Sequence, residues 1–196
     1  VGAPWTLIVY MMKVSKDNNF NFRKVEEIKD IDIILDNLFK FLSFHIQNQI
    51  EAGADTIQIF DSWAGLLPIE GLQKFCFEPN FKLVSFCKEK KIPVICFPKG
   101  IKKNYLKFNN IVKPNGINLD PEIDPIWAKT NLKDVTFQGG MNPKILLETE
   151  DKIFIEAKKY LDIFKDVPYI FNLGHGLVPE TNPDHVEKLV KFYRDY

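Results

Sequence analysis

The feature that most constrains the fold of this chain is the alternation of short apolar runs with stretches of helical periodicity. Each run has the length of a β-strand, and nearly every run ends in polar or glycine-rich residues. Strands that alternate with helices favour a parallel sheet, because parallel neighbours need long crossover connections. The runs lie at residues 7–11, 55–60, 92–97, 116–120, 135–140 and 169–173.

A long amphipathic stretch between residues 28 and 52 gives the clearest helix prediction. Apolar residues recur there at the spacing of one face of an α-helix. Gly53 is expected to end this helix, because glycine adopts the left-handed conformation of a helix end without strain. His45 lies beside the apolar stripe and is expected to be a partly buried structural histidine.

Further helices are predicted between the later strands. Pro79 is expected to break the first of them, because proline lacks the backbone N–H of a helix interior. The last helix is expected to turn Val186, Leu189 and Val190 inward. These predicted helices lie at residues 72–87, 104–108, 149–164, where Thr149 is the expected cap, and 183–196.

The distribution of the polar strand ends favours one α/β architecture over another. A (β/α)8 TIM-type barrel gathers every strand end around one pocket, whereas a doubly wound sheet places its site at a single switch point. A complete barrel has eight strands and typically about 250 residues. The sequence therefore predicts one domain over residues 1–196, an α/β barrel that is incomplete at its N-terminal side.

Composition narrows the class of protein. A chain of 196 residues with 45% hydrophobic residues can bury a sizeable core. The balance of 26 basic against 26 acidic residues gives no electrostatic argument for binding nucleic acid or a membrane surface. Three cysteines, Cys76, Cys87 and Cys96, favour buried thiols over a disulfide framework. We expect a soluble cytoplasmic protein, with a plastid-like organelle as the alternative location.

The Gly174-His175-Gly176 turn is the first candidate for a functional site. It follows the apolar run at residues 169–173, and Asn182-Pro183 then opens a helix. The imidazole of His175 is therefore expected at the carboxyl end of a strand, where α/β proteins carry their chemistry. On spacing alone, a glycine turn with an incidental histidine is an equal alternative.

Several blocks together resemble the uroporphyrinogen decarboxylase family. They occur in the family's order, at similar spacing and over nearly the whole chain, which corresponds to the C-terminal part of a family member. The blocks are Gly2-Ala3-Pro4-Trp5-Thr6-Leu7, Tyr10-Met11, Phe60-Asp61-Ser62-Trp63-Ala64-Gly65, Phe97-Pro98-Lys99-Gly100, Leu119-Asp120, Gln138-Gly139 and Asn172-Leu173-Gly174-His175-Gly176 with Pro179.

The resemblance implies a (β/α)8-barrel homodimer that converts uroporphyrinogen III to coproporphyrinogen III by removing carboxylate from all four acetate side chains. It implies no metal and no organic cofactor. Tyr10 matches the family's cleft tyrosine, Ser62 its substrate-binding serine and His175 its cleft histidine. All three are expected to bind the tetrapyrrole, and Tyr10 and His175 to be catalytic. Lys99 is a further candidate for contact with a carboxylate.

The resemblance also implies which site groups lie elsewhere. The family's site arginines, and the aspartate under its pyrrole N–H groups, fall in a segment before residue 1. We therefore expect these 196 residues alone to show no decarboxylation.

Two alternatives remain open from the sequence. Cobalamin-linked methyltransferases share the barrel, but they hold zinc through His-x-Cys, and here Val94 stands two residues before Cys96. A fragment that folds without catalysing a reaction is the other alternative.

Overall fold

The computed structural model describes residues 1–12 and 22–196. These residues form two compact units, 1–117 and 118–196, and each unit is described by itself. The prediction of a single domain over residues 1–196 stays a prediction.

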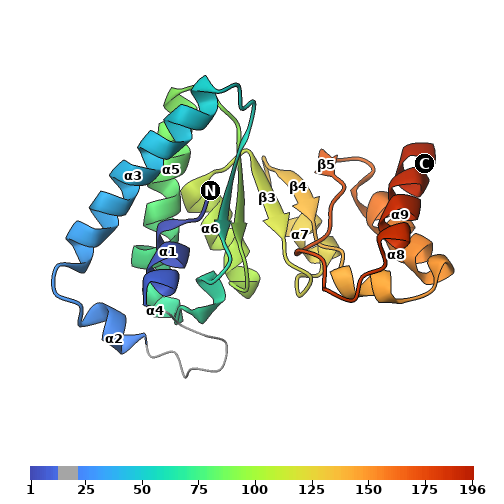
Figure 1. Ribbon diagram of the computed structural model, residues 1–196, viewed down its shortest axis with the longest axis horizontal. Coiled ribbons are helices and arrows are strands. Elements are labelled where there is room, and N and C mark those ends of the chain that lie inside the picture. Colours follow the sequence, from blue (N-terminus) through green and yellow to red (C-terminus); the bar gives the residue numbers. More distant parts are fainter. Residues whose placement is uncertain (13–21) are drawn as a thin grey trace. The chain divides into compact units, whose positions relative to one another are not determined.

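Unit 1 is built on parallel strands. Strand β1 (Ile57–Asp61) pairs with β2 (Val94–Pro98), and β2 pairs with β3 (Gly116–Leu119), whose last residues belong to unit 2. Helices α3 and α5 of unit 1 lie side by side (Figure 1). The helices of this unit are α1 (Pro4–Met11), α2 (Arg23–Glu26), α3 (Ile31–Glu51), α4 (Ile69–Leu72), α5 (Glu78–Glu89) and α6 (Tyr105–Val112), with single turns η1 (Ala64–Leu66), η2 (Gln73–Phe77) and η3 (Lys102–Asn104).

Unit 2 repeats the same alternation. Strands β4 (Thr136–Gly139) and β5 (Tyr169–Ile170) are parallel, with Phe137 opposite Tyr169. Helices α8 and α9 pack against each other (Figure 1). The helical elements of this unit are α7 (Pro125–Asn131), η4 (Pro143–Leu147), α8 (Glu150–Phe164) and α9 (Pro183–Asp195).

The fold class predicted from the sequence is confirmed. The strand order is β1-β2-β3-β4-β5, which is the order along the chain, as expected where helices connect parallel strands. A closed (β/α)8 barrel has eight strands, so the five strands of the described residues make an incomplete barrel.

The first predicted strand is wrong. Residues 7–11 belong to helix α1, which has proline at its first turn. A short buried apolar run fits a strand or a buried helix equally well, and Pro4 favours the helix because its fixed φ suits a helix start. The backbone of residues 1–3 instead extends beside β1, where the Ala3 N–H donates to the Phe60 carbonyl at 2.9 Å.

Pro79 does not break its helix. A π-helical turn, η2, precedes Pro79, and Pro79 then lies in the first turn of α5. Proline is tolerated here directly after a π-helical turn, which changes the local pattern of backbone hydrogen bonds. The chain is therefore helical from Ile69 to Glu89 without interruption.

Three details of the helices differ from prediction. His45 is exposed rather than partly buried, and it stacks on the exposed ring of Phe41. Val190 is exposed on α9, where Leu189 alone is fully buried. Helix α7 was not predicted; it begins at Pro125 after Asp124, whose carboxylate accepts from the backbone N–H groups of Ile126 and Trp127. Seven residues are too few for periodicity to indicate a helix.

Each unit has an aromatic core. In unit 1, the rings of Trp5, Phe22 and Phe75 lie within 5.4 to 6.2 Å of one another. In unit 2, Phe164 packs on Phe137 at 5.0 Å and on Tyr169 at 4.5 Å. Among the described residues, no helix is long and apolar enough to cross a membrane.

Candidate active site

The turn after β1 carries the predicted serine and rests on a buried carboxylate. Asp61, the last residue of β1, is 1% exposed, and Ser62 follows it at the half-buried start of the turn. The Asp61 side chain points into the protein, so the turn at Ser62 and Trp63 directly follows a carboxylate that water does not reach. This burial makes the carboxylate a structural anchor for the turn.

Two helices supply the hydrogen bonds to that carboxylate. From α1, the Thr6 hydroxyl donates to Asp61 Oδ1 at 3.0 Å. From α5, Asn80 Nδ2 donates to Asp61 Oδ2 at 3.1 Å and also to the Cys76 carbonyl at 2.8 Å. Each carboxylate oxygen therefore has a neutral donor.

The environment of Asp61 shifts its titration. Burial raises the pKa of the Asp61 carboxyl from 3.8 to about 6, because desolvation disfavours the charged form, while the hydrogen bonds from Thr6, Cys76 and Asn80 lower it. Desolvation is the larger effect.

Helix α1 is fastened to the same turn at two further points. Trp5 Nε1 donates to the Trp63 carbonyl at 2.9 Å, and the Trp63 N–H donates to Thr6 Oγ1 at 3.4 Å. One helical turn after Thr6, the ring of Tyr10 meets the Trp63 indole edge to face at 6.3 Å. The side chain of Tyr10 is 57% exposed. The structure thus places Tyr10 beside the turn that carries Ser62.

A second turn of unit 1 packs against the first. The Lys99 N–H donates to the Asp61 carbonyl at 3.2 Å, and the Gly65 N–H donates to the Lys99 carbonyl at 2.8 Å. A Cβ atom on Gly65 would lie 3.0 Å from Gly100 Cα, which is tighter than nearly all Cβ contacts in proteins. Glycine at position 65 therefore permits the contact that brings Lys99, half-buried, beside the candidate site.

The predicted histidine lies in unit 2 on an exposed turn. The Gly174 N–H donates to the Met141 carbonyl at 2.7 Å, and a Cβ atom on Gly174 would lie 2.9 Å from Pro121. These contacts of Gly174 hold the turn against the rest of unit 2, and the side chain of His175 is exposed. Beside it lies a hollow of about 360 Å³ with mostly apolar walls, among them Phe171, Leu177 and Leu189.

Buried polar groups also support the strand end next to this turn. Gln138 Nε2 donates to Asn118 Oδ1 at 2.8 Å, and both side chains are buried. The hydroxyl of Tyr169 donates to the Gly139 carbonyl at 2.8 Å. A Cβ atom on Gly139, whose φ is +74°, would lie 2.8 Å from the Leu173 carbonyl. Gly139 therefore allows the segment before His175 to pass close to β4.

Sequence reasoning proposed Tyr10, Ser62 and His175 as site residues and missed the residues that hold the turn at Ser62. Thr6 appeared only inside a family block and Asn80 not at all. Asn80 stands in a helix 19 positions from Asp61, and no spacing rule connects the two. The signal available in the sequence was that Asp61 directly follows the strand predicted at residues 55–60.

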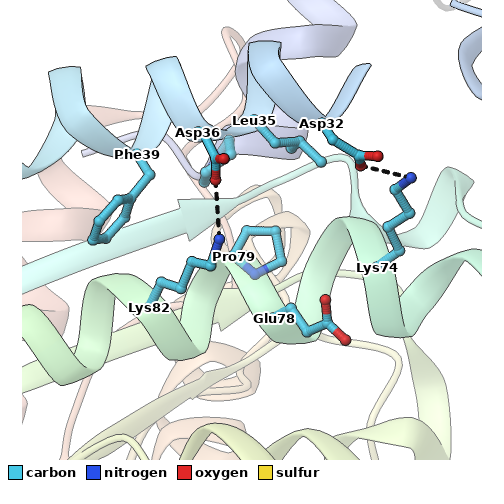
Figure 2. A pocket seen from close by; sticks show the side chains of 9 residues that line it. Asp32, Leu35, Asp36, Phe39, Lys74, Glu78, Pro79 and Lys82 are labelled. Carbon is cyan, nitrogen blue, oxygen red and sulfur yellow. Dashed lines mark hydrogen bonds and ion pairs between the residues drawn. The ribbon is translucent and has the colours of Figure 1, made fainter. Parts of the chain in front are cut away.

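A separate groove of unit 1 contains paired charges. It lies between α3 and α5 with a volume of about 420 Å³. Figure 2 shows Lys74 reaching Asp32 and Lys82 reaching Asp36, at 2.7 and 3.1 Å. All four side chains are largely exposed, so each pair adds at most about 1 kcal/mol. Both lysines of this groove are already paired.

The cysteines are buried thiols, as predicted. Cys76, Cys87 and Cys96 are free and buried. Desolvation raises the pKa of the Cys87 thiol to about 11 and raises those of Cys76 and Cys96 as well. The described residues hold no group of three His, Cys, Asp or Glu side chains that could bind a metal ion.

Comparison with known proteins gives a consistent result. The family model described as uroporphyrinogen decarboxylase (URO-D) matches residues 1–196. A protein named uroporphyrinogen decarboxylase from Rickettsia bellii is 40% identical over 200 residues, which cover 100% of this chain and 59% of that protein. Its namesake from Rhodospirillum rubrum is 35% identical over 199 residues, covering 98% of this chain and 57% of that protein. The chain thus spans less than two thirds of the length of these relatives.

A solved structure shares the fold. A methyltransferase from Methanosarcina mazei superposes with a TM-score of 0.75 over 89% of this chain and 52% of that chain, at 22% sequence identity. Identity at this level shows a common fold and says nothing of a common reaction.

Proposed function

Since the chain belongs to the uroporphyrinogen decarboxylase family, we propose that it is the C-terminal part of an enzyme that converts uroporphyrinogen III to coproporphyrinogen III. The observation that carries the proposal is the family match over all 196 residues. The pathway is that of porphyrin and haem, and the enzyme is a carboxy-lyase. The methyltransferase shares the fold alone, and no observation on the described residues favours methyl transfer.

The chemistry of the substrate sets what the site must do. An acetate on a pyrrole loses carbon dioxide readily once the ring has taken up a proton, because the protonated ring accepts the electron pair left by the broken carbon–carbon bond. The enzyme must therefore stabilise a cationic ring in a preorganised site. It must also hold the carboxylates of the substrate, which requires hydrogen-bond donors.

We assign the donors to the three predicted residues. The hydroxyls of Tyr10 and Ser62, both of unit 1, and a ring N–H of His175, of unit 2, are each proposed to donate to a substrate carboxylate. The exposure of Tyr10 and His175 and the hydrogen bonds that fix the turn at Ser62 support these roles. Lys99 is proposed as a further carboxylate contact.

Asp61 is not assigned to the cationic ring. Its carboxylate is 1% exposed and is bonded to Thr6 and Asn80, so a substrate does not reach it. The carboxylate that faces the ring is proposed to lie in the part of the family's length that this chain does not cover. The homodimer and the cytoplasmic location stay predictions.

The test supplies the missing length from a relative. This chain is joined behind the N-terminal part of the Rickettsia bellii protein that the match leaves uncovered, and the fusion is incubated with uroporphyrinogen III. Chromatography of the oxidised porphyrins should show coproporphyrin together with the partly decarboxylated intermediates. A folded fusion that forms none of them would contradict the proposal.

Two substitutions test the assigned residues in that fusion. Tyr10→Phe and His175→Asn should each lower turnover about tenfold or more, the effect of losing a hydrogen bond to a charged group. Tyr196→Phe is the matched control, because Tyr196 is 56% exposed, nearly as much as Tyr10, and bonds to Asp162 on α8. Equal kinetics for Tyr10→Phe and Tyr196→Phe would remove Tyr10 from the site.

A further inference from the structure

We infer that Asp61 is a positioning residue, which with Thr6 and Asn80 fixes the placement of the Tyr10 and Ser62 hydroxyls relative to each other. This inference rests on the proposed function, since it concerns how the same site is kept in shape. It assigns no contact between Asp61 and the substrate.

The first step is that burying the carboxylate of Asp61 lowers the stability of the fold through desolvation. Among the described residues, no Lys, Arg or His forms an ion pair with its carboxylate, and desolvation raises its pKa to about 6. The groups that face it are the Thr6 hydroxyl from α1, Asn80 Nδ2 from α5 and the thiols of Cys76 on η2 and Cys96 on β2. A neutral amide there would avoid this desolvation cost and could still bond to Thr6 and Asn80, so the charge of Asp61 is not needed merely to satisfy its neighbours.

The second step is that the bonds of Asp61 join the two elements that carry the site. Thr6 Oγ1 donates to Asp61 Oδ1 and also accepts from the Trp63 N–H, so one hydroxyl connects the strand end with the turn beyond Ser62. Asp61 is the residue immediately before Ser62. The backbone of Ser62 therefore cannot shift without disturbing the contact between α1 and the strand end.

The third step concerns Tyr10. Thr6 and Tyr10 are four positions apart on α1 and so lie on the same face of the helix. Where Thr6 meets the turn thereby sets where the ring of Tyr10 meets Trp63, at 6.3 Å. Loss of the bond at Thr6 lets α1 slide or rotate against the turn, and a misplacement of about 1 Å in a catalytic group can reduce turnover as much as 100-fold.

The experiment compares two substitutions of Thr6 in the active fusion described above. Thr6→Val keeps the shape of the side chain and removes the hydroxyl, whereas Thr6→Ser keeps the hydroxyl and removes a buried methyl group. We expect kcat/KM to fall roughly tenfold in Thr6→Val, mostly through kcat, and to stay within about twofold of the parent in Thr6→Ser. Circular dichroism confirms that both variants are folded.

A second readout does not depend on turnover. The nuclear Overhauser effect between the Tyr10 ring and the Trp63 indole should weaken in Thr6→Val and persist in Thr6→Ser. If Thr6→Ser is the more impaired variant, the contact is one of packing and the inference is wrong. If neither variant changes either readout, the inference is also wrong. An inactive parent fusion would count against the proposed function, while the ring contact would still decide the role of Thr6 and Asp61.

Discussion

Replacing Asp61 by asparagine should change how the stability of the protein depends on pH. Asparagine has nearly the shape of aspartate, and its carbonyl oxygen can still accept from Asn80 while its amide donates to Thr6. The substitution therefore removes a titrating charge without opening a cavity.

The sign follows from the direction of the pKa shift. The carboxyl of Asp61 titrates near 6 in the folded protein and near 3.8 in the unfolded chain. Below pH 3.8 both states bind the proton. Between pH 3.8 and 6 the unfolded chain releases it first, so the free energy of unfolding falls as the pH rises through this window. Above pH 6 the loss is complete.

The magnitude follows from the same two values. Raising the pKa of Asp61 from 3.8 to about 6 corresponds to about 3 kcal/mol, a sizeable part of the stability of a typical domain. We therefore expect the free energy of unfolding of the parent to fall by about 3 kcal/mol relative to Asp61→Asn between pH 3.5 and pH 7. At neutral pH the variant should gain stability relative to the parent while its turnover decreases.

Denaturant unfolding at several pH values between 3.5 and 7.5 measures this difference, provided that the m-values of the two proteins agree. Asp55→Asn is the control, because Asp55 is exposed just before β1 and its replacement leaves the buried site intact. Its stability should follow that of the parent across the range. Parallel curves for the parent and Asp61→Asn would show that the carboxylate is not desolvated, and the argument for Asp61 would lose its basis.

Two further predictions test the packing of the turns and of the thiols. Gly65→Ala should destabilise unit 1 by about 1 to 3 kcal/mol in chemical denaturation, because its methyl group would press on Gly100. Gly176→Ala is the control and should change stability little, since no neighbouring atom is found within 4 Å of the added methyl group. Equal effects of the two substitutions would contradict the close approach of the two turns. Iodoacetamide at pH 8 should label Cys76, Cys87 and Cys96 slowly in the native protein and rapidly after unfolding, because burial shields the thiols and raises their pKa. Intact-mass spectrometry measures the labelling. Fast labelling of the native protein would show that the thiols are accessible.

The order of strands and helices could be predicted from the sequence, because parallel β/α units leave a regular pattern. Residues 7–11 show the limit of that reasoning. A short apolar run between Pro4 and a polar segment fits both a strand and a buried helix. Pro4 favours the helix, because it lies in the first turn of α1, where proline is well tolerated. The prediction that Pro79 breaks its helix failed for a related reason. A π-helical turn precedes Pro79 and lets the helix continue through it.

The sequence predicted candidate site residues but not the buried groups that hold them in place. Tyr10 and Ser62 were identified through a resemblance that spans many blocks, and the structure brings Tyr10 to Trp63, the neighbour of Ser62. The partners of Asp61 could not be found in this way. Hydrogen bonds between residues 55 and 19 positions apart depend on how the helices dock, and no local pattern encodes them.

Both units solve the same physical problem beneath their candidate site turns. A turn that leaves a strand has backbone groups without ladder partners, and buried polar groups must be satisfied. Unit 1 uses Thr6 Oγ1 for the Trp63 N–H, and unit 2 uses the Tyr169 hydroxyl for the Gly139 carbonyl. Unit 2 completes its network with the neutral pair of Gln138 and Asn118, whereas unit 1 buries the ionisable Asp61.

That difference is the reason to place a positioning role at Asp61. If satisfying the turn were the only requirement, a neutral amide of the kind found in unit 2 would serve at lower cost, because it has no charge to desolvate. A carboxylate accepts at both oxygens and donates at neither, so it fixes the direction of both of its bonds, whereas an amide can reverse. Asp61 thus forces Thr6 and Asn80 to act as donors and holds α1 in one register against the turn that carries Ser62.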